Sequence, residues 1–516
     1  MSSNVATLYD ICSACGSITE GTFSGDAPSP RISELLRSND VPSDSELSNF
    51  RDIIKQGPRR ITNLDQKIAR TKAFLDALLN KRDLVEANIE DAKVLSSPVR
   101  RLPHDILRSI ALQTVLSPFE MMSSLFLPDS LDTRRSPRTL SQVCRTWRST
   151  IVSSPELWSS ISLYLTGSLE QPLSSICHSM FMLGLRLERS RNAPLSIYLH
   201  NDMLDTDHPF LSLISSRASS IKNLFIFSQC LRSMQGLCRS RGSWNNLRHL
   251  KIRAIDSRWP MGQIFDAFEY APKLQVFDCG VPQAQYVPLV PWVQLTHLTL
   301  RVQNKQHLEL IRQAKNITSL EVQGTGSMMP EECEAISLPF LASLTLRTQS
   351  TIISSLFIPN LTVLNLIYNG KPVFPRLTIP NTITTLKIIR RIPGRGPEEI
   401  CSFPGLPSLL ESVPYLRHLV LESSNPLSLT DINTLMPLPA CTPLPRLQIL
   451  DLRDCTLEFD HSKFVEMVTT RRLGNKPGID RLETVHLNGP LSLNGVCKHT
   501  WQSLCDERLK VTYAKS

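Results

Sequence analysis

A motif of the form L-x-x-L-x-L recurs through most of the chain and constrains its fold more than any other feature. Successive motifs start 20 to 35 residues apart, an interval that overlaps the roughly 20 to 29 residues of stacked-repeat solenoids. Their leading residues are Leu247, Leu274, Leu295, Ile317, Leu341, Leu361, Ile383, Leu416, Leu447 and Leu482. The apolar residues of each motif point into the core and the alternate residues point outward, so stacked strands form one parallel concave sheet.

The limits of the repeat array are marked by further residues. The repeats begin at about residue 195, and an early motif starts at Ile221. Proline stands two residues before the leading residue of five motifs, at Pro272, Pro339, Pro359, Pro414 and Pro445. Its fixed φ and missing N–H favour extended chain after each convex return. The segment from Val496, with Trp501 and Leu504, indicates a terminal helix and strand that cap the array. Residues 161–516 are therefore predicted to form a capped solenoid.

Residues 98–160 carry a helical pattern instead of a repeat. Pro103 suits the first turn of a helix, where its missing N–H costs nothing. A second helix is indicated by a stripe at i, i+3, i+4, i+7 and i+11. This stripe consists of Leu140, Val143, Cys144, Trp147 and Ile151. The segment closes with Pro155-Glu156-Leu157-Trp158.

The order LPxxIL, LxxVCRxWR and PELW closely resembles the F-box, so the chain resembles the F-box proteins with leucine-rich repeats, of the fungal type. The resemblance implies an α/β chain in which a helical segment and a three-helix F-box precede the solenoid. It also implies that the F-box docks on a Skp-type adaptor. The implied contact residues are Leu102, Pro103, Ile106, Leu107, Ile110, Leu140, Val143, Cys144 and Trp147. The connection from Ser117 to Pro137 is longer than the link of a compact F-box.

The same resemblance implies a function. The protein would be the substrate-recognition subunit of an SCF-type cullin-RING ubiquitin ligase, with the repeats holding an unidentified target protein and the adaptor leading to the cullin scaffold. A leucine-rich-repeat scaffold without a ubiquitin ligase role is the alternative.

Two segments precede the F-box-like region. Residues 1–45 are rich in Ser, Asp, Gly and Pro, which predicts a mobile tail. Cys12 and Cys15 form a lone C-x-x-C there, and a tetrahedral zinc site needs four ligands. We therefore interpret them as two exposed thiols, with no metal site.

Residues 46–97 are predicted to be helical, with apolar residues repeating every seven positions after Gly57-Pro58 until Pro98 ends the helix. One seam position holds Ile61, Ile68, Leu75 and Ile89, and the other holds Leu64, Thr71, Leu78, Val85 and Ala92. Thr71 and Arg82 interrupt the seam with polar groups. Two interpretations stay open: a coiled-coil homodimer, or an amphipathic helix that packs on residues 31–56 or on the next domain.

Composition and charge exclude several classes. The net charge of +9 and pI of about 8.9 are mild and dispersed, whereas nucleic-acid-binding domains usually show a clustered basic patch, so a nucleic-acid partner is not expected. The start of the sequence lacks the basic and apolar regions of a secretory signal, and no apolar run reaches the roughly 20 residues of a membrane span. A cytoplasmic or nuclear protein without a membrane partner is expected.

No catalytic motif stands out. The patterns G-x-S-x-G, H-E-x-x-H, G-x-x-x-x-G-K-[ST] and G-x-G-x-x-G are absent from the sequence, and the paired Cys and His ligands of a RING are missing. We therefore expect a protein that is not an enzyme and needs no cofactor. An enzyme whose catalytic residues meet only on folding is the alternative.

The outward positions of the predicted strands suggest a target surface. Arg253, Arg301, Arg347 and Arg453 each follow the last apolar position of a motif, which predicts one basic column on the concave sheet. His249, Lys251 and His297 lie beside it. Such a column could bind an acidic or phosphorylated segment through guanidinium pairs. The alternative is a set of solvated strand-end charges.

Overall fold

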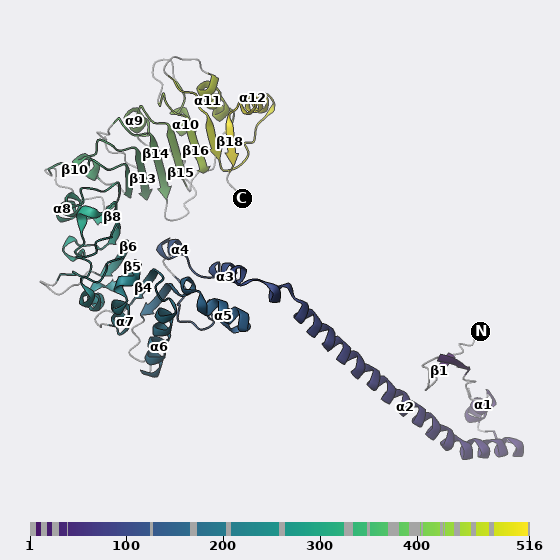
Figure 1. Ribbon diagram of the computed structural model, residues 1–516. Helices are drawn as coiled ribbons and strands as arrows, with labels where there is room; N and C mark the ends of the chain where they lie inside the picture. Colours follow the sequence, from purple (N-terminus) through teal and green to yellow (C-terminus); the bar gives the residue numbers. More distant parts are fainter. Residues whose placement is uncertain are drawn as a thin grey trace. The chain divides into compact units, whose positions relative to one another are not determined.

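A computed structural model describes most of the chain (Figure 1). The described residues are 7–11, 18–22, 30–38, 40–123, 127–165, 173–202, 208–256, 264–324, 334–347, 351–369, 381–391, 403, 406–423, 427, 429–437, 444–455, 461–473 and 479–513. Cys12 and Cys15, for which a pair of exposed thiols was expected, lie outside them. The chain divides into two compact units, Met1–Leu102 and Pro103–Ser516.

The first unit contains regular structure in the region for which the sequence predicts a mobile tail. Strands β1 (Thr7–Ile11) and β2 (Ile18–Thr22) pair antiparallel. Helix α1 (Pro30–Ser38) follows, and Arg31 forms an ion pair with Glu46 at 3.1 Å. A polar composition indicates that a segment can bury little apolar area, but it does not show whether two short segments pair as strands.

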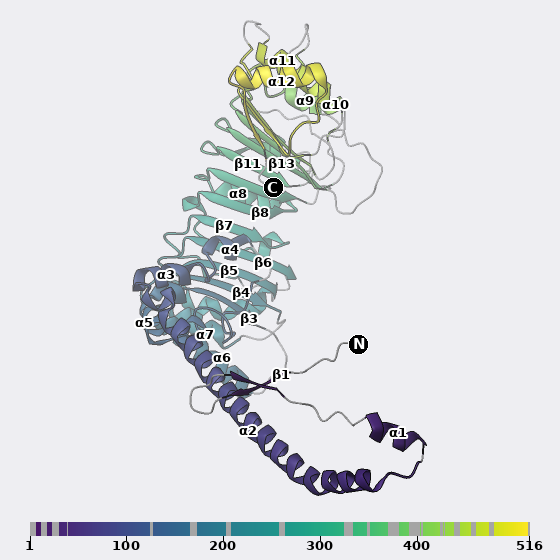
Figure 2. The same ribbon diagram turned by 90° about the vertical axis from the view of Figure 1, so that its right-hand side faces the viewer.

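Helix α2 (Asp44–Ser96) is one continuous element of 53 residues. A capping box starts it, because Glu46 accepts a hydrogen bond from the backbone N–H of Ser43. The helix therefore begins well before Gly57-Pro58 and contains Pro58, whose missing N–H removes one helical hydrogen bond and favours a bend. Figure 2 shows the helix curving in its N-terminal part. A 3-10 turn, η1 (Pro98–Arg101), ends the unit.

The apolar seam of α2 is uncovered within this unit. Every residue from Ile61 to Ser96 is exposed, including Ile68, Leu75 and Leu78, each about half exposed. Packing on residues 31–56 is therefore not observed among the described residues. A helix of this length is stabilised in water mainly by burying an apolar stripe.

The second unit opens within the F-box-like segment, at Pro103, and continues as a solenoid. The segment consists of α3 (His104–Leu112), α4 (Pro118–Ser123), η2 (Leu140–Gln142), α5 (Arg145–Ser153) and η3 (Pro155–Trp158). The first repeats contain β3 (Ser160–Leu165), α6 (Leu173–Arg189), β4 (Leu195–Asn201), α7 (Phe210–Ser216), η4 (Ala218–Ser220), β5 (Ile221–Cys230) and η5 (Leu231–Ser240).

The middle repeats contain β6 (His249–Asp256), β7 (Val276–Gly280), η6 (Ala284–Tyr286), η7 (Trp292–Gln294), β8 (His297–Val302), α8 (Lys305–Gln313), β9 (Ser319–Gly324), β10 (Ile336–Ser337), β11 (Ser343–Arg347), η8 (Thr351–Ser355), β12 (Leu356–Phe357) and β13 (Val363–Asn369). The last repeats contain β14 (Thr385–Arg391), α9 (Leu406–Glu411), β15 (His418–Ser423), α10 (Leu429–Asn433), β16 (Ile449–Asp454), α11 (His461–Leu473), β17 (Thr484–Leu487), α12 (Gly495–Asp506) and β18 (Lys510–Tyr513).

One parallel sheet of 14 strands runs through this unit from β3 to β18 and confirms the predicted leucine-rich-repeat solenoid. Each strand from β6 to β17 in the sheet begins two residues after a predicted leading residue, as β6 at His249 follows Leu247. Strands β3 and β4 extend the sheet beyond the predicted motifs. A separate parallel pair, β10 and β12, lies in the return segments.

The core of the solenoid lies between the sheet and the return segments. In a typical repeat all three motif residues are buried, as with Leu247, Leu250 and Ile252, each at most 1 % exposed. Trp244 and Phe268 fill the return side and meet edge to face. At the C-terminal end Trp501 of α12 packs near Phe464 of α11. In Figure 1 helices α8 and α9 lie along the outer side of the curved sheet. The alternate residues of the strands point to the opposite side.

None of the described helices is both long and apolar enough to cross a bilayer.

We propose that α2 pairs with a second copy of the chain through its seam, because the seam is regular and no described residue of its own unit covers it. Replacing Ile68 and Leu75 by Asp places two charges in the seam and should convert a dimer into a monomer. Sedimentation velocity of the full chain at micromolar concentrations measures this. Ala69→Asp with Ala77→Asp, off the seam, is the matched control and should leave the dimer intact. A wild-type chain that sediments as a monomer contradicts the proposal.

A buried histidine is expected to make the stability of the solenoid depend on pH. His307 of α8 is fully buried, and its Nδ1 lies 2.8 Å from Oδ1 of Asn304, the N-cap residue. Its Nε2 is buried without a hydrogen-bond partner, so the ring is neutral. Burial, and to a smaller extent the charge of Arg301, lowers the pKa of His307 to about 4.

Because the unfolded chain binds a proton on this ring near pH 6.5 and the folded chain near pH 4, folding stability should fall as the pH is lowered through this interval. His307→Gln keeps a donor for Asn304 and should flatten that pH dependence of the unfolding midpoint in denaturant. His178→Gln, on the exposed surface of α6, should leave the dependence unchanged. Equal slopes for wild type and His307→Gln would contradict the assignment.

Candidate functional site

The F-box-like segment is built around a small set of buried side chains. Helices α3 and α5 pack together, and the buried residues are Leu107, Ala111, Trp147, Ile151, Leu157 and Trp158. The indole N–H of Trp158 donates to the carbonyl of Ile151 at 2.9 Å. Pro103 precedes α3 as its N-cap residue, one position earlier than a first-turn proline.

The predicted second helix is broken. Residues 140–142 form the 3-10 helix η2, and α5 begins only at Arg145, because Cys144 has an extended backbone with φ of −160°. The five residues of the predicted stripe therefore do not share one face. Trp147 and Ile151 are buried, Leu140 is half-buried, and Val143 and Cys144 are exposed. The apolar spacing alone did not reveal this interruption.

The candidate adaptor residues consequently separate into two groups. Leu107 and Trp147 are buried and belong to the core, whereas Ile106, Ile110 and Val143 are 42, 41 and 61 % exposed. Pro103 and Cys144 are also exposed, and Leu102 and Leu140 are half-buried. Ile106 and Ile110 lie four residues apart and so share one face of α3.

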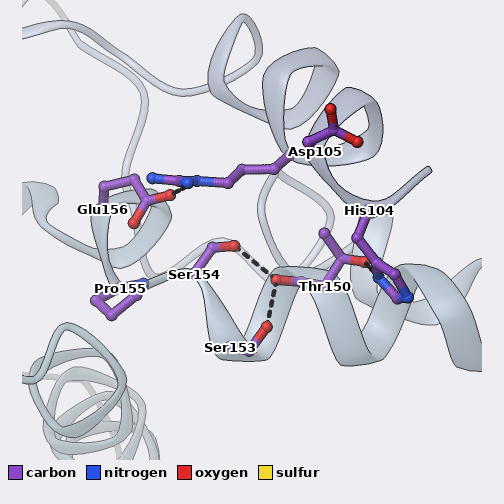
Figure 3. Close-up of a pocket in the computed structure, with 8 residues that line it drawn as sticks. His104, Asp105, Thr150, Ser153, Ser154, Pro155 and Glu156 are labelled. Atoms are coloured by element: carbon purple, nitrogen blue, oxygen red, sulfur yellow. Dashed lines mark hydrogen bonds and ion pairs between the residues drawn. The ribbon is translucent and has the colours of Figure 1, made fainter.

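A shallow cavity of about 420 Å³ lies between α3, the end of α5 and η3 (Figure 3). His104 Nδ1 lies 2.5 Å from the hydroxyl oxygen of Thr150. That hydroxyl donates to the carbonyl of Thr146, and the hydroxyls of Ser153 and Ser154 donate to the carbonyl of Thr150. Since Thr150 already uses its proton, His104 is the donor and does not act as a base toward it.

The connection from Ser117 to Pro137 docks on the first strands of the solenoid. Met121 and Leu127 pack with Tyr198 of β4 and Phe225 of β5 in a separate buried cluster. The N–H of Leu127 donates to the hydroxyl of Tyr164 at 2.7 Å. Helix α4 thus contacts the sheet (Figure 2) instead of completing a bundle with α3 and α5. It covers outward side chains of β4 and β5, so the open part of the concave face begins beyond β5.

The predicted basic column is present for three of its four arginines. Arg253 pairs in register with Gly280, and Arg301 and Arg347 both pair with Gln323, so the three lie on alternate strands of one column. Arg453 falls outside it, because a register shift between β15 and β16 pairs Glu422 with Asp454. Arg453 instead binds Asp451 of its own strand, with Nη2 to Oδ2 at 2.5 Å.

Carboxylates that the sequence analysis did not consider neutralise part of this column. Asp278 lies 3.0 Å from Arg253 and 3.7 Å from Lys251, and Glu321 lies 2.5 Å from Arg347. The burial of Asp278 raises its pKa, although the charges of Arg253 and Lys251 oppose that shift. The four cations Lys251, Arg253, Arg301 and Arg347 minus these two carboxylates leave a net charge of +2, so the surface is a mixed ion-pair network.

The two histidines beside the column differ in exposure. His249 is half-buried, and its Nδ1 lies 2.5 Å from the side-chain oxygen of Asn223. Burial, followed by the charges of Lys222 and Arg248, lowers the pKa of His249. His297 is exposed and contacts the hydroxyl of Thr296 at 2.9 Å. The lowered pKa favours the neutral ring of His249 beside the column.

A glycine creates the space for Arg253. The side chain of Arg253 crosses β7 at Gly280, where a Cβ atom would stand 2.4 Å from Cδ of the arginine. From there Nη1 donates to Oε1 of Gln323 on β9 at 2.9 Å. Any larger residue at position 280 would displace the guanidinium. This contact was not visible in the sequence, because it joins residues 70 positions apart.

Metal binding finds no support in the described part of the chain, where no three His, Cys, Asp or Glu residues gather closely enough to hold an ion.

Comparison with known proteins adds little to this picture. No protein-family model matches the chain, and no curated protein matches it. Among solved structures the chain is similar to an internalin from Listeria monocytogenes, with 14 % identity and a TM-score of 0.28. The match covers 76 % of this chain and 96 % of the internalin. A TM-score this low carries no argument, and the solenoid is established by the strand register above.

Gly280→Ala should displace the Arg253 side chain and cost about 1 kcal/mol of folding free energy, the scale of a partly exposed charge-assisted hydrogen bond. In an Arg253→Ala background the same change should cost almost nothing, because the displaced group is already gone. Urea unfolding of the four variants measures this cycle. Gly489→Ala, where an added Cβ meets no atom within 4 Å, is the control. Equal costs of Gly280→Ala in both backgrounds would contradict the contact.

Proposed function

We propose that the protein is the substrate-recognition subunit of an SCF-type cullin-RING ubiquitin ligase. The F-box-like segment, residues 98–160, binds a Skp-type adaptor, which links the chain to the cullin scaffold. The solenoid binds a target protein on the open concave face. In this role the chain has no catalytic step of its own, needs no cofactor and works in the cytoplasm or nucleus.

The observation that carries the proposal is the exposed apolar face of α3. Ile106 and Ile110 remain more than 40 % exposed although Leu107 and Ala111 of the same helix are buried. Single exposed apolar residues are ordinary on protein surfaces. Here two of them share a face in the motif that resembles an F-box, and Val143 adds a third in the same segment. An adaptor that covers these side chains would remove apolar area from water.

The buried members of the motif have a different role. Leu107 and Trp147 position α3 and α5, so replacing them would unfold the segment and would not test docking. The surface proposed to bind the adaptor therefore excludes the buried residues. It consists of the exposed Pro103, Ile106, Ile110, Val143 and Cys144, with the half-buried Leu102 and Leu140 at its border.

The open concave face supports target binding by polar contacts. Strands β6 to β11 present four cations and two carboxylates outward: Lys251, Arg253, Arg301, Arg347, Asp278 and Glu321. With a net charge of +2, this surface favours a target that offers both carboxylates and hydrogen-bond donors. A purely acidic or phosphorylated segment would have to displace existing ion pairs.

Ile106→Ala with Ile110→Ala should weaken binding of a recombinant Skp-type adaptor at least about tenfold, because both anchors of the docked helix are truncated. Isothermal titration with the full chain measures the dissociation constant. Val293→Ala with Val496→Ala removes apolar groups that are even more exposed, at 62 and 82 %, elsewhere on the surface and should change the dissociation constant less than about twofold.

A double variant that retains wild-type affinity and its unfolding midpoint would defeat the assignment. The alternative, a repeat scaffold without a ubiquitin ligase role, predicts that the adaptor binds but that no cullin co-purifies with the complex.

A further inference from the structure

An arginine-lined cavity lies at the junction of the F-box-like segment and the first repeat, and neither α3 nor the concave column contributes to its lining. Its volume is about 240 Å³. Five arginines line it, from the 127–138 loop, α5 and α6: Arg135, Arg138, Arg148, Arg186 and Arg189. Asp132 is its only lining carboxylate among the described residues. Five positive charges minus one leave +4 around one small cavity.

Few of these charges are compensated. Arg135 forms an ion pair with Asp132 at 3.4 Å. Arg138 donates to the thioether of Met182, and Arg148 donates to the carbonyl of Ser141. Arg189 makes no hydrogen bond or ion pair with the described residues and lies over the ring of Trp158, 4.5 Å from its centroid. Asp129 and Glu188 favour the charges of Arg186 and Arg189 only at longer range.

The floor of the cavity is fixed. Arg186 is only 7 % exposed, and its two terminal nitrogens donate to the carbonyls of Ser130 and Ser160 at 3.0 Å. Its Nε is buried with no partner. The two backbone carbonyls thus hold the guanidinium in place beside the cavity.

The rim of the cavity is apolar on one side. Phe181 lies on α6 and is 67 % exposed, with Met182 and Leu185 next to it in the lining. A ligand that carries a compact anion on a small apolar or aromatic group would match both sides. The cavity volume is below the roughly 300 Å³ of sites for drug-sized molecules, so the ligand or the part of it inside is small.

We propose that this cavity binds a phosphate monoester. The phosphate takes its place among Arg138, Arg148 and Arg189 above Arg186, and the organic group rests against Phe181. A phosphate dianion offers three terminal oxygens to several guanidinium forks, which a carboxylate with two oxygens and a single charge does not. The ester is either a free small molecule or a phosphorylated side chain of a protein segment.

The experiment uses the full chain at physiological salt with two probes, phenyl phosphate and a degenerate phosphotyrosine peptide pool, each against its unphosphorylated form. We expect saturable binding of phenyl phosphate, measured by isothermal titration, and no binding of phenol. Peptide-pool binding at least about tenfold tighter than that of phenyl phosphate assigns the site to a protein segment, whereas equal binding assigns it to a small molecule.

Arg138→Gln with Arg189→Gln should weaken phenyl phosphate binding at least about tenfold, through the loss of charge-assisted hydrogen bonds. Both side chains are only half-buried and neither is among the proposed adaptor residues, so the unfolding midpoint should change little and adaptor binding should stay unchanged. Arg134→Gln with Arg145→Gln removes the same charge from neighbouring exposed positions that do not line the cavity and should leave the affinity unaltered. The proposal is overturned if wild type binds neither probe saturably, or if both double variants bind alike.

Discussion

The stacking of buried motif residues along one parallel sheet is the interaction on which the rest of the structure depends. Each strand adds a rung of apolar side chains, and no repeat could bury its own face alone. Because successive strands pair in register over most of the sheet, outward residues far apart in sequence align in columns. The surface chemistry of the concave face is therefore a direct product of the register of the core.

The first strands of the solenoid also position the F-box-like segment. The loop around Ser130 pairs with Ser162 of β3 through backbone and hydroxyl hydrogen bonds, and α4 covers β4 and β5. Buried Arg186 ties that loop to the same strand. The segment and the first repeats thus form a continuous structure, with the proposed docking residues on α3, the arginine-lined cavity at the junction and the open sheet beyond β5.

Periodicity predicted the solenoid. Apolar residues at i, i+3 and i+5 located the start of each strand from β6 to β17 in the sheet, two residues after the leading residue. It did not predict the break at Val143 and Cys144, because an apolar spacing is the same for one helix or for two short ones. Periodicity also did not predict that carboxylates neutralise part of the arginine column. Asp278 and Glu321 form ion pairs with arginines on neighbouring strands, and these pairs depend on the direction of each side chain. Gly280 matters only because the side chain of Arg253 passes over it.

Hydrogen exchange of the full chain with and without a Skp-type adaptor tests the central claim most directly, because it reports which backbone segments the adaptor protects. The account predicts slowed exchange in peptides that cover residues 102–113 and 140–146, with the concave strands β6 to β11 unchanged. Protection confined to the concave strands, or no protection at a saturating adaptor concentration, would contradict the docking of an adaptor on α3.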